Sequence, residues 1–267
     1  MTHIYNLRRQ AEDPRDFRLA VPKAVKLPRS VDLRENCPPV FDQGSLGSCT
    51  ANAGVAAYMM LKDVDEEHSR LFLYYEERRL EGTTGEDAGA TMRSVGKALE
   101  KTGVCLEPLW PYLAEKFDDD PPEAADNDAA GRKVKSYRKL EGVTGLKQYL
   151  AEQNLPVMIG IDVYESFETQ TVAETGLVPV PKSGEKLLGG HAVLLVGYDD
   201  DFTGAEKAPE NAGGETPLGC WGEDDEDTSP GYFIARNSWG EAWGRKGYFY
   251  LPYAFMDQYA YDFWVLE

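Results

Sequence analysis

The chain has 267 residues, of which 42% are hydrophobic, which is enough for one large domain or two lobes around a cleft. Its formal net charge of −18 leaves no excess of Lys and Arg to neutralise phosphates, so we expect no nucleic-acid partner. The first ten residues lack the apolar run of a secretory signal, and no stretch reaches the roughly 18 apolar residues of a membrane helix. We therefore expect a cytoplasmic protein with no membrane partner, while export by another route stays open.

The first part of the chain predicts an arm followed by helices. Residues 1–26 are polar and carry Pro14 and Pro22, so we expect an extended N-terminal extension. Helical composition and spacing predict helices over 48–64, 71–80 and 90–103, with Ser48 as an N-cap and Gly103 as a stop. Residues 117–132 have loop composition and are expected to join a helical lobe, about 45–125, to a second lobe.

The second part, about 130–267, is rich in predicted strands. Apolar and β-branched runs predict them over 133–140, 155–164, 191–198, 232–236, 247–251 and 261–266, with a Thr144-capped helix over 144–153. An acidic, Gly- and Pro-containing insertion over 199–230 is expected on a loop that leaves the strands in place. A helical lobe followed by an antiparallel β lobe is an α+β fold.

Four side chains in this order could carry thiol chemistry. Cys49 stands at the mouth of a predicted helix, where the helix dipole favours the thiolate. His191 heads the predicted strand 191–198 and can supply an imidazolium, while the side-chain carbonyl of Asn237 can hold that ring in one tautomer. Trp239 can shield this hydrogen bond from water, and the Gln43 amide with the Cys49 N–H can form an oxyanion hole.

The strings around these residues resemble those of the papain-like cysteine peptidases, over roughly residues 27–267. They are QGSLGSCT at 43–50, GGHAVLLVGYD at 189–199 and ARNSWGEAWGRKGYFY at 235–250, preceded by LPRSVDLRENCPPVFDQG. The resemblance implies a two-lobe fold with a helical N-terminal lobe, a β-barrel-like C-terminal lobe and the active site in the cleft between them. It also implies the order Gln43, Cys49, His191, Asn237 for the catalytic machinery.

The chain departs from the family pattern at two positions beside the nucleophile. Leu46 stands where most relatives have a disulfide-forming Cys, and Thr50 replaces the usual Trp, which favours a bacterial-type, unbridged branch. The extension 1–26 is too short for a large helical pro-domain, so it either lies through the cleft as a short pro-segment or packs on the surface. By resemblance, Gly89 and Ala90 pair with a substrate backbone. Met92, Gly160 and Ala192 then line an apolar pocket for the second residue before the cleaved bond.

The remaining cysteines and histidines carry no predicted site. Cys37 and Cys105 can form a disulfide or stay apart, and Cys220 in the insertion can be an exposed thiol. His3 and His68 are expected on the surface. Because no Cys or His residues show paired ligand spacing, we expect no metal and no cofactor.

We therefore expect a monomeric cysteine endopeptidase that acts on polypeptides through an acyl-enzyme and can be bound by protein inhibitors. A transpeptidase or ligase using the same acyl-enzyme is an alternative, because the nucleophile and base would be shared. A non-catalytic peptide-binding relative is a second alternative, although it would have no need of all four residues.

Overall fold

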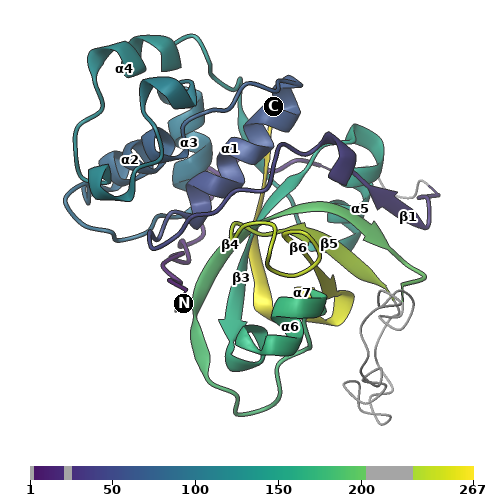
Figure 1. Ribbon diagram of the computed structural model, residues 1–267. Coiled ribbons are helices and arrows are strands. Elements are labelled where there is room, and N and C mark those ends of the chain that lie inside the picture. Colours follow the sequence, from purple (N-terminus) through teal and green to yellow (C-terminus); the bar gives the residue numbers. More distant parts are fainter. Residues whose placement is uncertain (1–2, 21–25, 203–230) are drawn as a thin grey trace.

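The computed structural model describes residues 3–20, 26–202 and 231–267. Four helices gather on one side of the molecule and an antiparallel sheet lies on the other (Figure 1). The helices of the first group are α1 (Cys49–Lys62), α2 (Arg70–Glu81), α3 (Met92–Lys101) and α4 (Glu123–Ala129). Helix α1 contacts α2, α3 and strand β4 (Leu187–Asp199), so it lies at the junction between the helical group and the sheet.

One antiparallel sheet runs in the order β2-β7-β3-β4-β5-β6, and β1 pairs with β4 outside this path. Its other strands are β1 (Ser30–Asp32), β2 (Tyr137–Lys139), β3 (Val157–Tyr164), β5 (Tyr232–Arg236), β6 (Tyr248–Pro252) and β7 (Ala260–Leu266). Helices α5 (Gly142–Gln153), α6 (Gln170–Thr175) and α7 (Tyr253–Tyr259) complete this part of the chain. Within the described residues β2 and β6 form the two ends of the order and do not pair with each other, so the expected barrel-like sheet is open rather than closed.

Small residues allow α1 to pack closely against its neighbours. Every residue from Cys49 to Met60 is buried, and Ala and Gly make up a large part of that stretch. A Cβ on Gly54 would clash with the Val95 side chain of α3. The helix is therefore buried on all sides and fixed by several neighbours. This rigidity holds its first residue, Cys49, in place.

Several predicted elements differ from the observed ones, and the strand predicted over 133–140 is shorter than expected, covering only Tyr137–Lys139. Helix α4 forms within 117–132, where a loop was expected, because Ala125 and Ala129 lie four residues apart on one helix face and are both buried. Helix α5 begins at Gly142, so Thr144 lies inside the helix rather than at its cap. Strand β4 begins at Leu187, because the glycines before His191 also pair with β3, and His191 therefore lies within the strand rather than at its start.

The three described cysteines, Cys37, Cys49 and Cys105, are free thiols, so Cys37 and Cys105 do not form a disulfide. Cys220 and most of the acidic insertion, 203–230, lie outside the described residues. In the part of the chain that the structure describes, no helix has the length and apolarity to cross a membrane. The same part contains no group of three or more His, Cys, Asp or Glu residues placed to hold a metal ion.

Candidate active site

The nucleophile candidate opens α1. Cys49 is the first helical residue and Ser48 occupies the N-cap position, but the Ser48 side chain does not cap the helix. The Ser48 hydroxyl lies 2.5 Å from the Tyr112 hydroxyl and accepts a hydrogen bond from the Asn52 amide at 3.1 Å. The first backbone N–H groups of α1 thus keep no side-chain cap, and the positive end of the helix dipole is directed at the Cys49 region.

His191 and Asn237 lie in contact, as the tautomer argument requires. The His191 Nε2 lies 2.8 Å from the Asn237 Oδ1, which also accepts the Ser238 N–H at 2.9 Å. Because a side-chain carbonyl only accepts, the Nε2 must carry the proton. The His191 Nδ1 is buried without a hydrogen-bond partner in the described residues, so the Cys49 thiol forms no hydrogen bond with it in this state.

Two aromatic and polar neighbours hold this pair. The Trp239 ring stacks on His191 with centroids 5.0 Å apart, and both side chains are buried. Asn237 follows directly after β5, and Ala235 and Arg236 of that strand pair with β4, which fixes the Asn237 backbone relative to His191. Ser238, which the sequence reasoning did not single out, joins this pair to Gln43. Its only signal in the sequence was its place inside the Asn-Ser-Trp string.

Gln43 is held by its backbone and by both ends of its side chain. Its N–H donates to the Ser238 carbonyl at 2.8 Å, and its Oε1 accepts the Ser238 hydroxyl at 2.6 Å. The Gln43 Nε2 donates to the Leu46 carbonyl at 2.8 Å. Fixing the Oε1 by Ser238 orients the amide so that its N–H₂ side faces the segment that leads to Cys49.

The candidate nucleophile and base are fully covered, with Cys49 and His191 both 0% exposed. Burial raises the pKa of the Cys49 thiol to about 12, against the smaller opposing effect of a hydrogen bond to the Ala192 backbone. Burial likewise lowers the pKa of His191 to about 4, although the hydrogen bond to Asn237 acts in the other direction. In this state both groups are neutral at pH 7.

The cover is the N-terminal extension, which lies between the helical group and the sheet (Figure 1). The Leu7 N–H donates to the Gly190 carbonyl at 3.1 Å, and the Arg8 N–H donates to the Ala90 carbonyl at 3.2 Å. A Cβ on Gly89 would meet the Asn6 carbonyl oxygen. The extension therefore uses backbone of both sides of the site, and glycine is required where it passes closest.

Side chains of the extension cover the site from one end to the other. The His3 ring stacks on Trp239 with centroids 3.7 Å apart, and the Tyr5 ring meets His191 edge-on at 6.1 Å. Leu7 is buried and lies against the position that a Cβ on Gly160 would take. His3 is thus part of this cover rather than a free surface residue. His68 is buried as well, at 2% exposed, with its Nδ1 2.7 Å from the Glu66 carbonyl.

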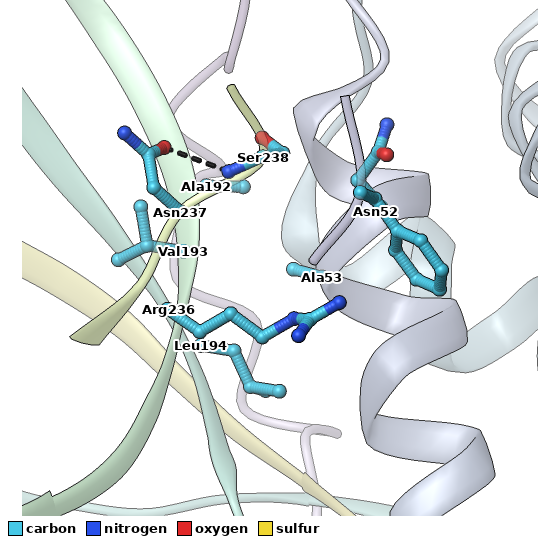
Figure 2. Close-up of a pocket in the computed structure, with 9 residues that line it drawn as sticks. Asn52, Ala53, Ala192, Val193, Leu194, Arg236, Asn237 and Ser238 are labelled. Atoms are coloured by element: carbon cyan, nitrogen blue, oxygen red, sulfur yellow. Dashed lines mark hydrogen bonds between the residues drawn. The ribbon is translucent and has the colours of Figure 1, made fainter. Parts of the chain in front are cut away.

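The predicted substrate-binding residues fall into two groups. Gly89, Ala90 and Gly160 lie along the extension, as a peptide-binding wall would. Ala192 and Met92 are buried in the main core. Ala192 also lines a cavity of about 10 Å³ between α1 and β4, together with Asn237 and Ser238, which has room for about one water molecule (Figure 2).

Asp87 is a further residue that the sequence reasoning missed. Its carboxylate accepts the Gly47 N–H at 3.0 Å and the Tyr74 hydroxyl at 2.5 Å, and the Tyr74 oxygen accepts the Gly89 N–H at 3.1 Å. The backbone carbonyl of Asp87 also accepts a hydrogen bond from the Asn6 side-chain amide at 2.9 Å. Asp87 therefore links the loop before the nucleophile to the wall that contacts the extension.

The chain resembles known proteins in both sequence and fold. Residues 27–259 match the model of the papain family cysteine proteases. The chain is 35% identical to an uncharacterized peptidase C1-like protein of Acanthamoeba polyphaga mimivirus, covering 92% of this chain and 72% of that protein. Xylellain, a cysteine protease from Xylella fastidiosa, is 34% identical over 98% of this chain and 95% of its own, with a TM-score of 0.81. Digestive procathepsin L 3 of Tenebrio molitor shares the fold at 21% identity and a TM-score of 0.64, covering 93% and 74%.

Proposed function

The chain belongs to the papain family of cysteine proteases, and we propose that it is an endopeptidase whose nucleophile is Cys49 and whose base is His191. The observation that carries this assignment is the 2.8 Å contact between His191 Nε2 and Asn237 Oδ1. It leaves Nδ1 without a partner in the described residues, as a base for Cys49 at the start of α1 requires. Asn237 is the positioning residue for the ring.

In the proposed reaction, the Cys49 proton passes to His191 Nδ1 and the thiolate attacks the peptide carbonyl carbon. The Gln43 amide and the Cys49 N–H hold the oxyanion of the tetrahedral intermediate. His191 then gives its proton to the leaving amine as the C–N bond breaks, which leaves a thioester. Water, deprotonated by His191, hydrolyses the thioester and restores the thiol.

The N-terminal extension is proposed to keep this enzyme latent. It buries Cys49 and His191 completely, and burial favours the neutral thiol and imidazole over the ion pair that attack requires. Displacement of the extension would admit water and substrate together. The positive end of α1 and the imidazolium would then favour the thiolate.

The direction of the extension explains how it can lie over the nucleophile without being cut. Its N-terminal end lies on Trp239, beside the base that protonates the leaving amine, and its later residues lie at Gly89 and Gly160. The pocket for residues before the cleaved bond is assigned to Gly89 and Gly160, so a substrate would run the opposite way. A reversed backbone presents its carbonyl groups out of line for attack.

Leu7 supports an apolar preference at the second residue before the cleaved bond. It is 6% exposed and lies between Gly160 and Gly190, with the Tyr261 ring also beside Gly160. Glycine at both positions leaves room that a side chain would otherwise fill. A Leu, Phe or Tyr side chain of a substrate would bury its apolar surface in the same slot.

The test is labelling of the full-length chain with a thiol-directed epoxysuccinyl inhibitor. We expect slow labelling of Cys49 in the natural chain and at least about tenfold faster labelling in Leu7→Asp, because a buried carboxylate in the apolar slot would displace the extension. Phe17→Asp is the matched control, since Phe17 belongs to the same extension but is 76% exposed.

Absence of Cys49 labelling in both chains would contradict the nucleophile assignment, and equal fast labelling would contradict latency. Mass spectrometry of products from Leu7→Asp, with an added amine acceptor, separates hydrolysis from transpeptidation or ligation. Peptides ending in a free carboxylate are expected, whereas peptides joined to the acceptor would favour the transferase alternative.

A further inference from the structure

The two arginines that follow Leu7 in the extension form ion pairs with carboxylates of the enzyme body. Arg8 forms an ion pair with Glu81, the last residue of α2, and the Arg9 Nη2 lies 2.5 Å from the Asp162 Oδ2 on β3. The Arg9 guanidinium also lies 4.0 Å from the centre of the Tyr261 ring. Each carboxylate side chain is only 13% exposed, whereas the two arginines are 45% and 57% exposed. The enzyme side of each contact is therefore the buried side.

Glu81 is fixed by the enzyme body and not by the extension. Its Oε1 accepts the Thr91 N–H at 3.0 Å, the Thr91 hydroxyl at 3.0 Å and the Ser94 hydroxyl at 2.6 Å. These donors occupy one oxygen, and the other, Oε2, is the atom that forms the ion pair with Arg8. The carboxylate is thus pre-organised to receive a cation.

Asp162 shares a strand face with the apolar slot. It lies two residues after Gly160 on β3, and successive side chains of a strand point to opposite faces, so both positions face the extension. The extension has the same period, because Leu7 contacts Gly160, Arg9 contacts Asp162 and the intervening Arg8 turns to Glu81 on the helical side. Any extended peptide in this groove would alternate its side chains between the same two walls.

We infer that Glu81 and Asp162 are specificity residues that select substrates with basic side chains beyond the apolar one. This rests on the proposed function. Moving away from Cys49, the second residue before the cleaved bond would fill the slot, the third would face Glu81 and the fourth would face Asp162. The substrate class is Lys- and Arg-rich polypeptide, and the net charge of −18 would attract such chains.

The test uses the full-length chain with Leu7→Asp, Arg8→Ser and Arg9→Ser, so that the extension competes for neither carboxylate. Internally quenched peptides carry Leu at the second position and Arg, Gln or Glu at the third or the fourth. We expect kcat/KM in the order Arg, Gln, Glu, with about two- to fivefold between Arg and Gln at each position, which is the upper part of the range for exposed ion pairs.

Adding Glu81→Gln should abolish the preference at the third position alone, and adding Asp162→Asn should abolish it at the fourth alone. Glu100→Gln and Asp257→Asn, at exposed positions, are matched controls for the loss of one negative charge and should change neither. If a Glu81 or Asp162 variant fails to fold, the order of kcat/KM for the Arg, Gln and Glu peptides on the parent chain still tests whether basic side chains are preferred. Equal kcat/KM for all three peptides would overturn the inference while the peptidase assignment stands.

Peptide binding to a chain without the proposed nucleophile tests the two carboxylates independently of catalysis. Fluorescence polarisation with a labelled Arg-Arg-Leu-Ser peptide, on the same chain with Cys49→Ala, should show tighter binding than with Gln-Gln-Leu-Ser, and Glu81→Gln should reduce the difference. Selective binding without cleavage of any peptide would overturn the peptidase assignment and leave the cation subsites standing. Equal binding of the two peptides would overturn the subsites.

Discussion

Glu77 lies next to Cys49, the proposed nucleophile, but takes no part in the proposed reaction. Its side chain is 0% exposed in α2, and its Oε2 accepts the hydroxyl of Thr50, the residue after Cys49, at 2.5 Å. The Glu77 Oε1 is buried without a hydrogen-bond partner in the described residues. Burial raises the pKa of Glu77 to about 8, against the opposing effects of the Thr50 hydrogen bond and the Arg78 charge. A neutral carboxyl here keeps a negative charge away from the thiolate.

The raised pKa of Glu77 predicts how stability depends on pH. The pKa of Glu77 is about 8 in the folded chain, so the folded chain holds this proton up to about pH 8, whereas the unfolded chain releases it near pH 4.5. The stability that comes from binding this proton is therefore fully present below about pH 4.5 and is lost progressively as the pH rises toward 8. Glu77→Gln removes the titration, so thermal melts should show the variant gaining stability over the natural chain between pH 4.5 and 8. A constant difference in Tm across that range would contradict the assignment.

Arg78 of α2 joins two loops around the site wall, the α2–α3 connection and the segment that contains Phe117. Its guanidinium donates to the carbonyls of Thr84 at 2.7 Å, Glu86 at 3.1 Å and also Phe117, and the side chain is fully buried. Helix α2 therefore holds the segment that leads to Asp87 and Gly89. Such a buried cation is stable because carbonyl oxygens replace its water.

Removing this guanidinium should destabilise the fold. Arg78→Met leaves buried carbonyls without their donor, and we expect the free energy of unfolding to fall by about 2–4 kcal/mol. Arg79→Met is the matched control, because Arg79 is 57% exposed and pairs with Glu76, so its loss should cost less than about 1 kcal/mol. Urea denaturation measures both. Equal losses would contradict the bridging role of Arg78.

The sequence predicted the long elements better than their ends. Periodicity and composition located α1, α2 and α3 to within two or three residues. The start of β4 was missed because glycines carry no hydrophobic pattern, and their strand pairing depends on β3, which is distant in sequence. The four catalytic candidates could be named from local strings, but the contact of Gln43 with Ser238 depends on how two distant segments meet.

At the scale of the whole molecule, the sequence could not say where the N-terminal extension lies. Its polar composition predicted an extended segment, and both the cleft and the surface remained open. The backbone pairing of Leu7 with Gly190 and of Arg8 with Ala90 decides between them, and no local pattern encodes such long-range contacts. The role of Leu7, Arg8 and Arg9 likewise depends on residues that are distant in sequence, because Leu7 contacts Gly160 and the arginines pair with Glu81 and Asp162.

Charge pairs join the extension to the body, which predicts a response to salt. Besides the pairs at Glu81 and Asp162, Arg93 pairs with Asp16 at 2.6 Å and Arg18 pairs with Glu141. Raising NaCl from about 0.1 to 1 M shortens the screening length from about 10 to 3 Å, which weakens partly exposed pairs. We expect Cys49 in the natural chain to react several-fold faster with iodoacetamide, a neutral reagent whose own encounter rate is insensitive to salt.

Peptide mass spectrometry should follow Cys49 separately from the other thiols, because Cys37 and Cys105 are also free. The Leu7→Asp chain serves as the control, since its extension is already displaced and its Cys49 reactivity should change little with salt. If the natural chain instead reacts at the same rate at both salt concentrations, the backbone pairing and the apolar slot alone hold the extension closed. A salt effect confined to the natural chain would show that the ion pairs help to hold the extension over the site. The carboxylates inferred to bind basic substrates would then also contribute to latency.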